Sequence, residues 1–339
     1  MKLRISPLFV CAVLAWTSLV LGADETDQPQ PTGKSTATDV ATPGEPPTEP
    51  TFLLRYKFHA GQLLRWKIEH LVTVKTKIQG TIQKAETRSL STKAWRVISV
   101  NSEGEAVYAH MVEDVDMWQK VTGRQEIRYN SKTDDKPPPD YVNAAAAVGV
   151  TLSTITLSAK GTVIERNNRR GMPDSKNAPV TMPLPERSVK IADKWDQPYG
   201  IPVRKHDGTL IHIQARQVFQ LDKVVAGLAT ISLKSEVLTP VNDPRIEAQL
   251  VQRLLNGTIK FDIDAGRVQR QRMASKASVL AFSGADSSMD YKARFTEDFL
   301  SVDVEAVAEP ATQADSADKE PRKPLRTVER RRKSARIRR

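Results

Sequence analysis

Residues 64–78 alternate between apolar and charged or polar side chains, and this alternation restricts the fold more than any other feature of the chain. Successive side chains of a β-strand point to opposite faces, so the pattern predicts a strand with one dry face and one charged face. At ~3.3 Å per residue the strand would be roughly 50 Å long, and we expect it to bend or to contain a bulge. Its predicted apolar face consists of Leu64, Trp66, Ile68, Val72 and Val74.

Two further stretches, residues 90–100 and 106–117, continue this alternation. They are separated by Asn-Ser-Glu-Gly at residues 101–104, whose residue types favour a tight reversal of the chain. The sequence therefore predicts a β-hairpin here.

An order of strands, helix and hairpin occurs twice along the chain, which indicates an internal duplication. Residues 97–109 can be laid over residues 221–233, with two strands around a glycine-containing turn in each case. Asp243 as a cap, Pro244 at the first helical position and Gly257 beyond the end favour a helix in the second half. The paired features are Trp66 and Trp195, helices at 139–148 and 244–255, and hairpins around Gly161 and Gly266.

The predicted fold is mainly β (α+β), a large curved antiparallel sheet of about ten to twelve strands with two repeats and two short helices. Ten strands at ~4.8 Å spacing make a sheet nearly 50 Å wide, and two helices of ~10 Å diameter cover less than half of it. Two architectures would shield the rest of the dry face. The sheet closes into a barrel or sandwich around its own side chains, or it remains a half-barrel whose concave surface takes an apolar ligand.

The N-terminal region predicts export. Lys2 and Arg4 precede an uncharged apolar run that ends in small residues, which is the pattern of a secretory signal peptide over residues 1–23. The alternative is an uncleaved anchor, although the apolar run falls short of the ~20 residues that a membrane span needs. We therefore expect a periplasmic, cell-surface or extracellular protein. Removal of Cys11 leaves no cysteine, so the fold rests on apolar burial without disulfides.

Composition divides the remaining chain. Residues 24–50 contain six prolines and no aromatic residue and predict a disordered acidic tether, while residues 306–339 predict a disordered tail. Between them we expect a first β-rich repeat at 51–176 and a second at 177–305.

The net charge of +11 is concentrated at the C-terminus, because residues 319–339 carry +9 and residues 51–318 only +5. A dense run of guanidinium groups binds phosphate, carboxylate or sulfate. We predict that this tail binds a polyanion, namely an anionic envelope polymer or lipid headgroups rather than a specific nucleic acid. The alternative is a solubilising tail without a fixed partner. The predicted contacts are Arg330, Arg331, Arg332, Lys333, Arg336, Arg338 and Arg339.

Motifs that carry chemistry are absent from the sequence. It contains no Gly-x-Ser-x-Gly turn, no His-Glu-x-x-His pair and no glycine-rich phosphate loop. No cofactor or metal is therefore expected. Asp262 and Asp264, close to Gly266, are typical of a hairpin turn and supply too few oxygen donors for a calcium loop.

Two groups of polar residues remain as candidates. Glu113, Asp114 and Asp116, with His110 nearby, fit a solvated strand face better than a metal or acid–base site. His70 lies on the dry side of its strand, where a hydrogen bond to a neighbour is expected rather than a metal.

Four segments, LRYKFHAGQLLRW, YAHMVEDVDM, GRQEIRYN and IEAQLVQRLLNGTIKFDIDAGRV, resemble an uncharacterised family of exported bacterial β-sheet proteins. The resemblance extends over residues 51–300 and includes neither tail. It implies a compartment and a fold type, and it implies no activity.

Three classes of function follow from these observations. We favour a non-enzymatic structural or interaction protein of the envelope that binds polyanions through its tail. The alternative is a carrier or binding module for an apolar, lipid-like ligand in a half-barrel. An enzyme of an unrecognised type is the third class.

Overall fold

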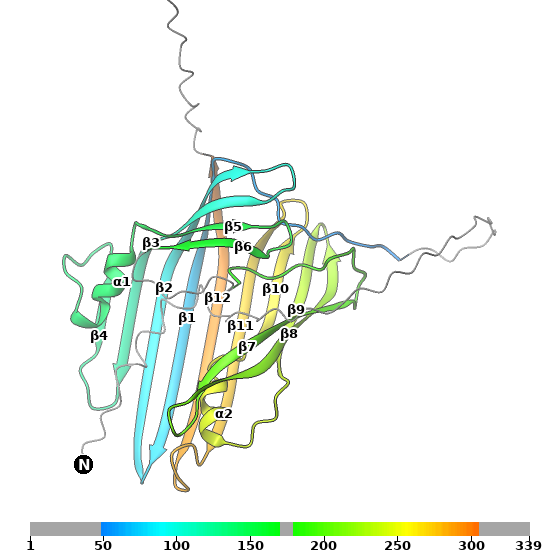
Figure 1. Ribbon diagram of the computed structural model, residues 1–339. Coiled ribbons are helices and arrows are strands. Elements are labelled where there is room, and N and C mark those ends of the chain that lie inside the picture. The colour runs from blue at the N-terminus through cyan, green and yellow to red at the C-terminus, as the bar shows by residue number, and fades with distance from the viewer. Residues whose placement is uncertain (1–48, 170–178, 305–339) are drawn as a thin grey trace, which may run out of the picture. The chain divides into compact units, whose positions relative to one another are not determined.

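The computed structural model describes residues 49–169 and 179–304, which form an open antiparallel sheet of 12 strands with two short helices (Figure 1). This confirms the predicted fold class. The described residues all belong to one compact unit. The predicted signal peptide, nearly all of the tether and the tail with its seven basic residues lie outside the described residues. No helix in the described ranges is long and apolar enough to cross a bilayer.

The elements follow one another along the chain with a short 3-10 turn, Pro139–Tyr141, before the first helix. They are β1 (Gln62–Ile78), β2 (Thr81–Val100), β3 (Ala106–Val121), β4 (Ile127–Asn130), α1 (Val142–Ala147), β5 (Thr151–Leu157), β6 (Val163–Asn168), β7 (Lys194–Arg204), β8 (Leu210–Val225), β9 (Leu228–Val237), α2 (Pro244–Leu250), β10 (Asn256–Asp262), β11 (Arg267–Leu280) and β12 (Ser288–Val304).

The sheet contains the same strand order twice. Its order is β6-β5-β3-β2-β1-β12-β11-β10-β9-β8-β7, with β4 paired to β3. The first half pairs β1-β2-β3-β5-β6 and the second pairs β7-β8-β9-β10-β11, with one helix before the last hairpin of each half. Strand β12 lies between β1 and β11 and joins the two halves. The order expected from the internal duplication is therefore present, while the domain boundary at 176/177 remains a prediction.

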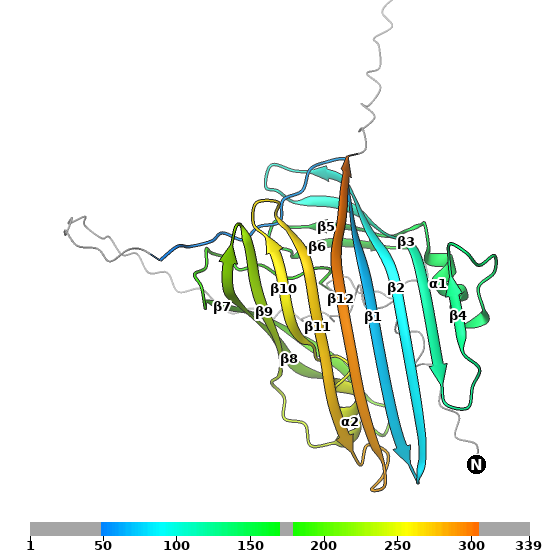
Figure 2. The same cartoon turned by 180° about the vertical axis from the view of Figure 1, so that it is seen from behind.

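One hydrophobic core contains residues from both ends of the sheet, so the sheet curls. Ile155 of β5 and Phe219 of β8 belong to the same buried cluster, although eight strand spacings of ~4.8 Å would hold them roughly 38 Å apart in a flat sheet. Figure 1 shows β5 and β6, and β7 and β8, in front of the central strands. We call the face that carries the buried side chain of Trp66 the inner face, and the opposite face, which carries the exposed side chain of Lys67, the outer face. Figure 2, seen from behind, shows the central strands β2, β1, β12 and β11 in front of β5 and β6.

Strand β1 has the alternation that its sequence predicts. Leu64, Trp66 and Ile68 are buried, whereas Lys67 and Lys75 are exposed. The expected irregularity is a register shift between Arg65 and Trp66 in the pairing with β12. Farther along the same face the side chains are only half-buried; these are Val72 and Val74, which pack against the cluster beside α2. Whether this apolar face binds a ligand remains a prediction.

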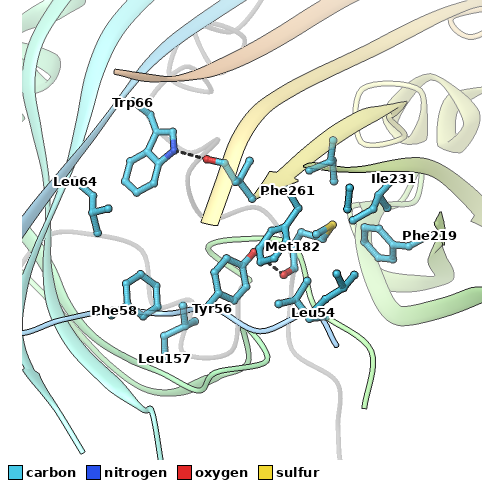
Figure 3. Close-up of a cluster of buried hydrophobic side chains, with 14 of the residues drawn as sticks. Leu54, Tyr56, Phe58, Leu64, Trp66, Leu157, Met182, Phe219, Ile231 and Phe261 are labelled. Carbon is cyan, nitrogen blue, oxygen red and sulfur yellow. Dashed lines mark hydrogen bonds between the residues drawn. The ribbon is translucent and has the colours of Figure 1, made fainter. Parts of the chain in front are cut away.

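Two extended segments, residues 52–58 and 180–189, contribute side chains to the core. They pair with each other, because Phe52 N donates to the Val189 carbonyl over 2.8 Å and Val189 N donates back over 3.0 Å. Figure 3 shows Tyr56 and Phe58 among the core residues, with the Tyr56 hydroxyl donating to the Met182 carbonyl at 2.9 Å. The connections that precede the two repeats therefore help to fill the interior.

Residues 56 and 57 also hold the two repeat hairpins together. Tyr56 N donates to the Ala159 carbonyl in the β5–β6 turn over 2.7 Å, and Lys57 N donates to the Gly266 carbonyl in the β10–β11 turn over 3.0 Å. The backbones approach so closely that a Cβ at Gly266 would lie 2.5 Å from Lys57 N. The φ of Gly266 is 59°, a left-handed value that glycine adopts most readily.

Both helices are shorter than predicted. Helix α2 begins as expected, since the Asp243 side chain accepts from Arg245 N at 2.8 Å and Pro244 follows the cap. It ends at Leu250, however, and a turn follows in which Arg253 N donates to the Leu250 carbonyl. Gly257 does not terminate the helix, because it lies in β10 and pairs with neighbouring strands.

Candidate functional site

The inner face of the central strands contains a buried ion pair. Lys93 of β2 and Glu297 of β12 project to the same side across β1, and Lys93 Nζ lies 2.5 Å from Glu297 Oε1. Both side chains are less than a tenth exposed. Gln271 of β11 donates to the other oxygen of Glu297 at 3.2 Å. The carboxylate is therefore hydrogen-bonded from two strands.

Two tryptophans enclose the ammonium group of this pair. Lys93 Nζ lies 4.6 Å from the centre of the Trp66 ring and 4.8 Å from that of Trp95, which is cation–π geometry. The ammonium is thus shared between one carboxylate and two aromatic faces. Lys93 of β2 is thereby joined to β1 through Trp66 and to β12 through Glu297.

Further buried polar groups lie toward β3 and β5 on the inner face. Tyr108 and His110 of β3 are almost wholly buried, as is Ser153 of β5, which is in register with His110. Burial, together with the nearby charges of Lys93 and Arg166, lowers the pKa of His110 to about 3. Burial raises the pKa of the Tyr108 hydroxyl well above its usual value. All three side chains are therefore neutral at physiological pH.

His70 of β1 lies on this same inner face. It is 7% exposed and contacts Phe295 edge-to-face at 6.4 Å between ring centres. Burial lowers its pKa to about 4. In the described residues no group of three His, Cys, Asp or Glu side chains has the geometry to hold a metal ion.

We expect acidification to destabilise the fold through His110. Its unfolded pKa of 6.5 exceeds the folded value of about 3, so its contribution is complete above pH 6.5 and is lost as the pH falls toward 3. The loss is at most ~1.4 kcal/mol per pH unit for one histidine. Urea unfolding between pH 7 and pH 4 should show a shallower pH dependence for His110→Gln than for the parent. Equal slopes for the variant and the parent would contradict the assignment.

The acidic group on β3 does not form a common site. Glu113 pairs with Arg65 at 2.8 Å, Asp114 with Lys132 at 3.0 Å and Asp116 with Arg88 at 3.0 Å. Their half-exposed carboxylates each have a separate cation, whereas His110 is buried on the inner face. This geometry agrees with a solvated strand face.

The pair near Gly266 is likewise part of a turn. Asp262 accepts from Ala265 N at 2.8 Å and from Gln269 Nε2 at 3.1 Å. These bonds close the β10–β11 turn, in agreement with the hairpin interpretation.

The outer face carries a row of exposed basic side chains along β12 and its two neighbours. Lys292 of β12 is directly opposite Lys276 of β11, an arrangement that destabilises a sheet unless an anion compensates. Four of the row's members, Lys67, Lys276, Lys292 and Arg294, have no acidic partner within 4.0 Å among the described residues; the fifth, Arg272, pairs with Asp298. We call Lys67, Arg272, Lys276, Lys292 and Arg294 the basic row.

The basic row borders a hollow of about 410 Å³ on the outer face. The hollow is lined by Lys67, Glu69, Leu90, Arg272, Arg294, Thr296 and Asp298. Asp298 is neutralised by Arg270 at 2.6 Å and by Arg272 at 3.0 Å. We call each outward residue of β12 from Lys292 to Asp298, with its partners on β1 and β11, a register. The four registers contain six cations, which are the basic row and Arg270, and only two carboxylates, Glu69 and Asp298.

This row was not predicted from the sequence, although Arg270, Arg272 and Lys276 share one period-two phase, as do Lys292 and Arg294. That spacing places them on one face of each strand. Their alignment across strands depends on the β1-β12-β11 register, which the sequence does not reveal.

No known protein-family model matches the chain, and no curated protein matches it. Among solved structures, lipovitellin is 10% identical with a TM-score of 0.43 over 75% of this chain, which spans only 27% of the lipovitellin chain. The β domain of the Bordetella autotransporter BrkA is 7% identical with a TM-score of 0.30, covering 69% of this chain and 98% of that one. Likenesses at these TM-scores establish neither a shared fold nor a shared function. The resemblance to an exported β-sheet family remains a prediction.

Proposed function

We propose that this protein is an exported, non-enzymatic interaction protein of the cell envelope that binds an anionic partner. The observation that carries the proposal is the basic row, in which four exposed cations lack an acidic partner among the described residues. Exposed, unpaired cations attract polyanions with little desolvation cost. The tail residues Arg330, Arg331, Arg332, Lys333, Arg336, Arg338 and Arg339 are proposed as a second basic region of the same function.

Shortening the tail tests its share of this function. A chain that ends at Asp318 lacks a charge of +9. We expect it to lose most of its affinity for vesicles of phosphatidylglycerol, with a weaker dependence on salt, because each phosphate contact adds roughly 0.7–0.9 to the salt slope. Its melting temperature should stay nearly unchanged, since all described residues are retained. Affinity and salt slope equal to those of the full chain would remove the tail from the proposed function.

A carrier for an apolar ligand is the second candidate function. It is favoured by the inner face of β1 beyond the core, where Val72 and Val74 are only half-buried. Lipid-sized adducts retained in native mass spectrometry of protein from its own cells would support it. Protein free of adducts under conditions that preserve known lipid complexes would argue against it.

A further inference from the structure

The basic row has a regular spacing that follows from the sheet itself. Lys292, Arg294 and Thr296 alternate along β12, and their partners on β11 are Lys276, Ala274 and Arg272. Residues two apart on an antiparallel strand lie ~6.8 Å from each other. The four successive registers begin at Lys292 and end where Lys67 pairs with Asp298. The cations that they contain are therefore distributed over roughly 20 Å along the strands.

This spacing selects among anionic partners. Adjacent Cα atoms are separated by three covalent bonds and lie ~3.8 Å apart. Two neighbouring phosphorus atoms linked as P–O–C–C–C–O–P are separated by six bonds, so in an extended chain they lie about 7 Å apart. An extended polymer of phosphodiesters joined by three-carbon units thus presents one charge per register of the row. Arg272 and Arg294 add a chemical preference, since guanidinium groups bind phosphate in bidentate fashion.

The curvature of the sheet limits how much membrane could contact the row. The sheet curls toward its inner face, so the outer face is the convex one. A flat bilayer would contact this convex surface only along a narrow strip parallel to the strands, whereas a single polymer chain needs no wider surface than the row itself. The hollow beside Arg272 and Arg294 offers one recessed position along the path.

We infer that the outer face binds an extended linear phosphodiester polymer, which lies parallel to β12 along the basic row. This inference rests on the proposed function and specifies its partner. The row supplies the contacts of the folded body, independently of the tail.

The test compares two triple variants of the full chain. Lys276→Gln, Lys292→Gln and Arg294→Gln together remove three unpaired cations of the row. The control variant combines Arg187→Gln, Lys205→Gln and Lys223→Gln. It removes the same number of positive charges, also two lysines and one arginine, from exposed positions outside the row. Each protein is titrated with a linear oligomer of glycerol phosphate at several salt concentrations. The row variant should lose at least about tenfold in affinity and two to three units of salt slope, and the control less than about threefold.

Melting temperatures provide the check on folding, and the row variant should melt no lower than the parent because it removes a like-charge pair. Equal losses for the two variants would overturn the inference, while continued dependence on the tail would leave the proposed function standing. Parallel titrations use polygalacturonate, whose charges lie closer together, and phosphatidylglycerol vesicles. Row-dependent binding that is tighter for either probe than for the phosphodiester oligomer would also overturn it.

Discussion

Replacing Glu297 by glutamine should destabilise the protein by about 3–5 kcal/mol, because it leaves Lys93 as an uncompensated charge in the interior. Both partners of this pair are less than a tenth exposed. The two tryptophan rings already contact Lys93 in the parent, so they do not replace the attraction that is lost with the carboxylate. Urea unfolding at pH 7 measures the change.

The neighbouring residue on β12 supplies a matched control. Asp298 is on the outer face and pairs with Arg270 and Arg272, whose side chains are both more than two-fifths exposed. Asp298→Asn should therefore cost less than about 1 kcal/mol. A double variant, Lys93→Met with Glu297→Leu, should be more stable than Glu297→Gln alone, because no buried charge remains. Equal losses for Glu297→Gln and Asp298→Asn would contradict the assigned burial.

Features encoded by neighbouring residues were predictable from the sequence. The alternation in β1 determines which side chains lie inside, and the Asn101 turn is closed by local bonds, since Asn101 Oδ1 accepts from the backbone of Glu103 and Glu105. The turn between β1 and β2 was missed, although Gln79 and Gly80 both have positive φ, as a type I′ turn requires. Gln-Gly is not the Asn-Gly or Asp-Gly pair that marks such turns, so β2 was predicted to start at residue 90 instead of Thr81.

Features that depend on distant pairing were not predictable. Lys93 falls on the same side of β2 as Trp95, where a charge breaks the expected pattern, and its partner Glu297 is 204 residues away. The basic row likewise requires β12 to lie between β1 and β11 in one register. Periodicity determines the face on which each residue lies, whereas only the assembled sheet determines its neighbours. The Lys93–Glu297 pair and the basic row are therefore defined by the order and register of the strands, and not by the sequence of any one strand.

The segment that precedes β1 connects the two halves of the sheet, and this makes Tyr56 a sensitive position. Its ring lies 5.4 Å from that of Phe261 in the second half and 6.0 Å from that of Phe58. The ring centre of Phe58 in turn lies 6.5 Å from that of Tyr108 in the first half. The hydroxyl of Tyr56 is buried and lies 2.7 Å from the Thr181 hydroxyl. Tyr56 thus contacts both repeats and the second extended segment.

Tyr56→Ala should lower the free energy of unfolding by about 3–5 kcal/mol, because it removes a buried aromatic ring. The cavity cannot easily close, since residues from both halves of the sheet pack around it. Tyr56→Phe keeps the ring and should cost only ~1 kcal/mol for the lost hydrogen bonds. Lys57→Ala is the matched control, because the Lys57 side chain is exposed and its backbone bond to Gly266 is retained. Urea unfolding monitored by tryptophan fluorescence would rank the three variants. A loss of stability for Tyr56→Ala no larger than that for Lys57→Ala would show that the two halves of the sheet are held together by other contacts.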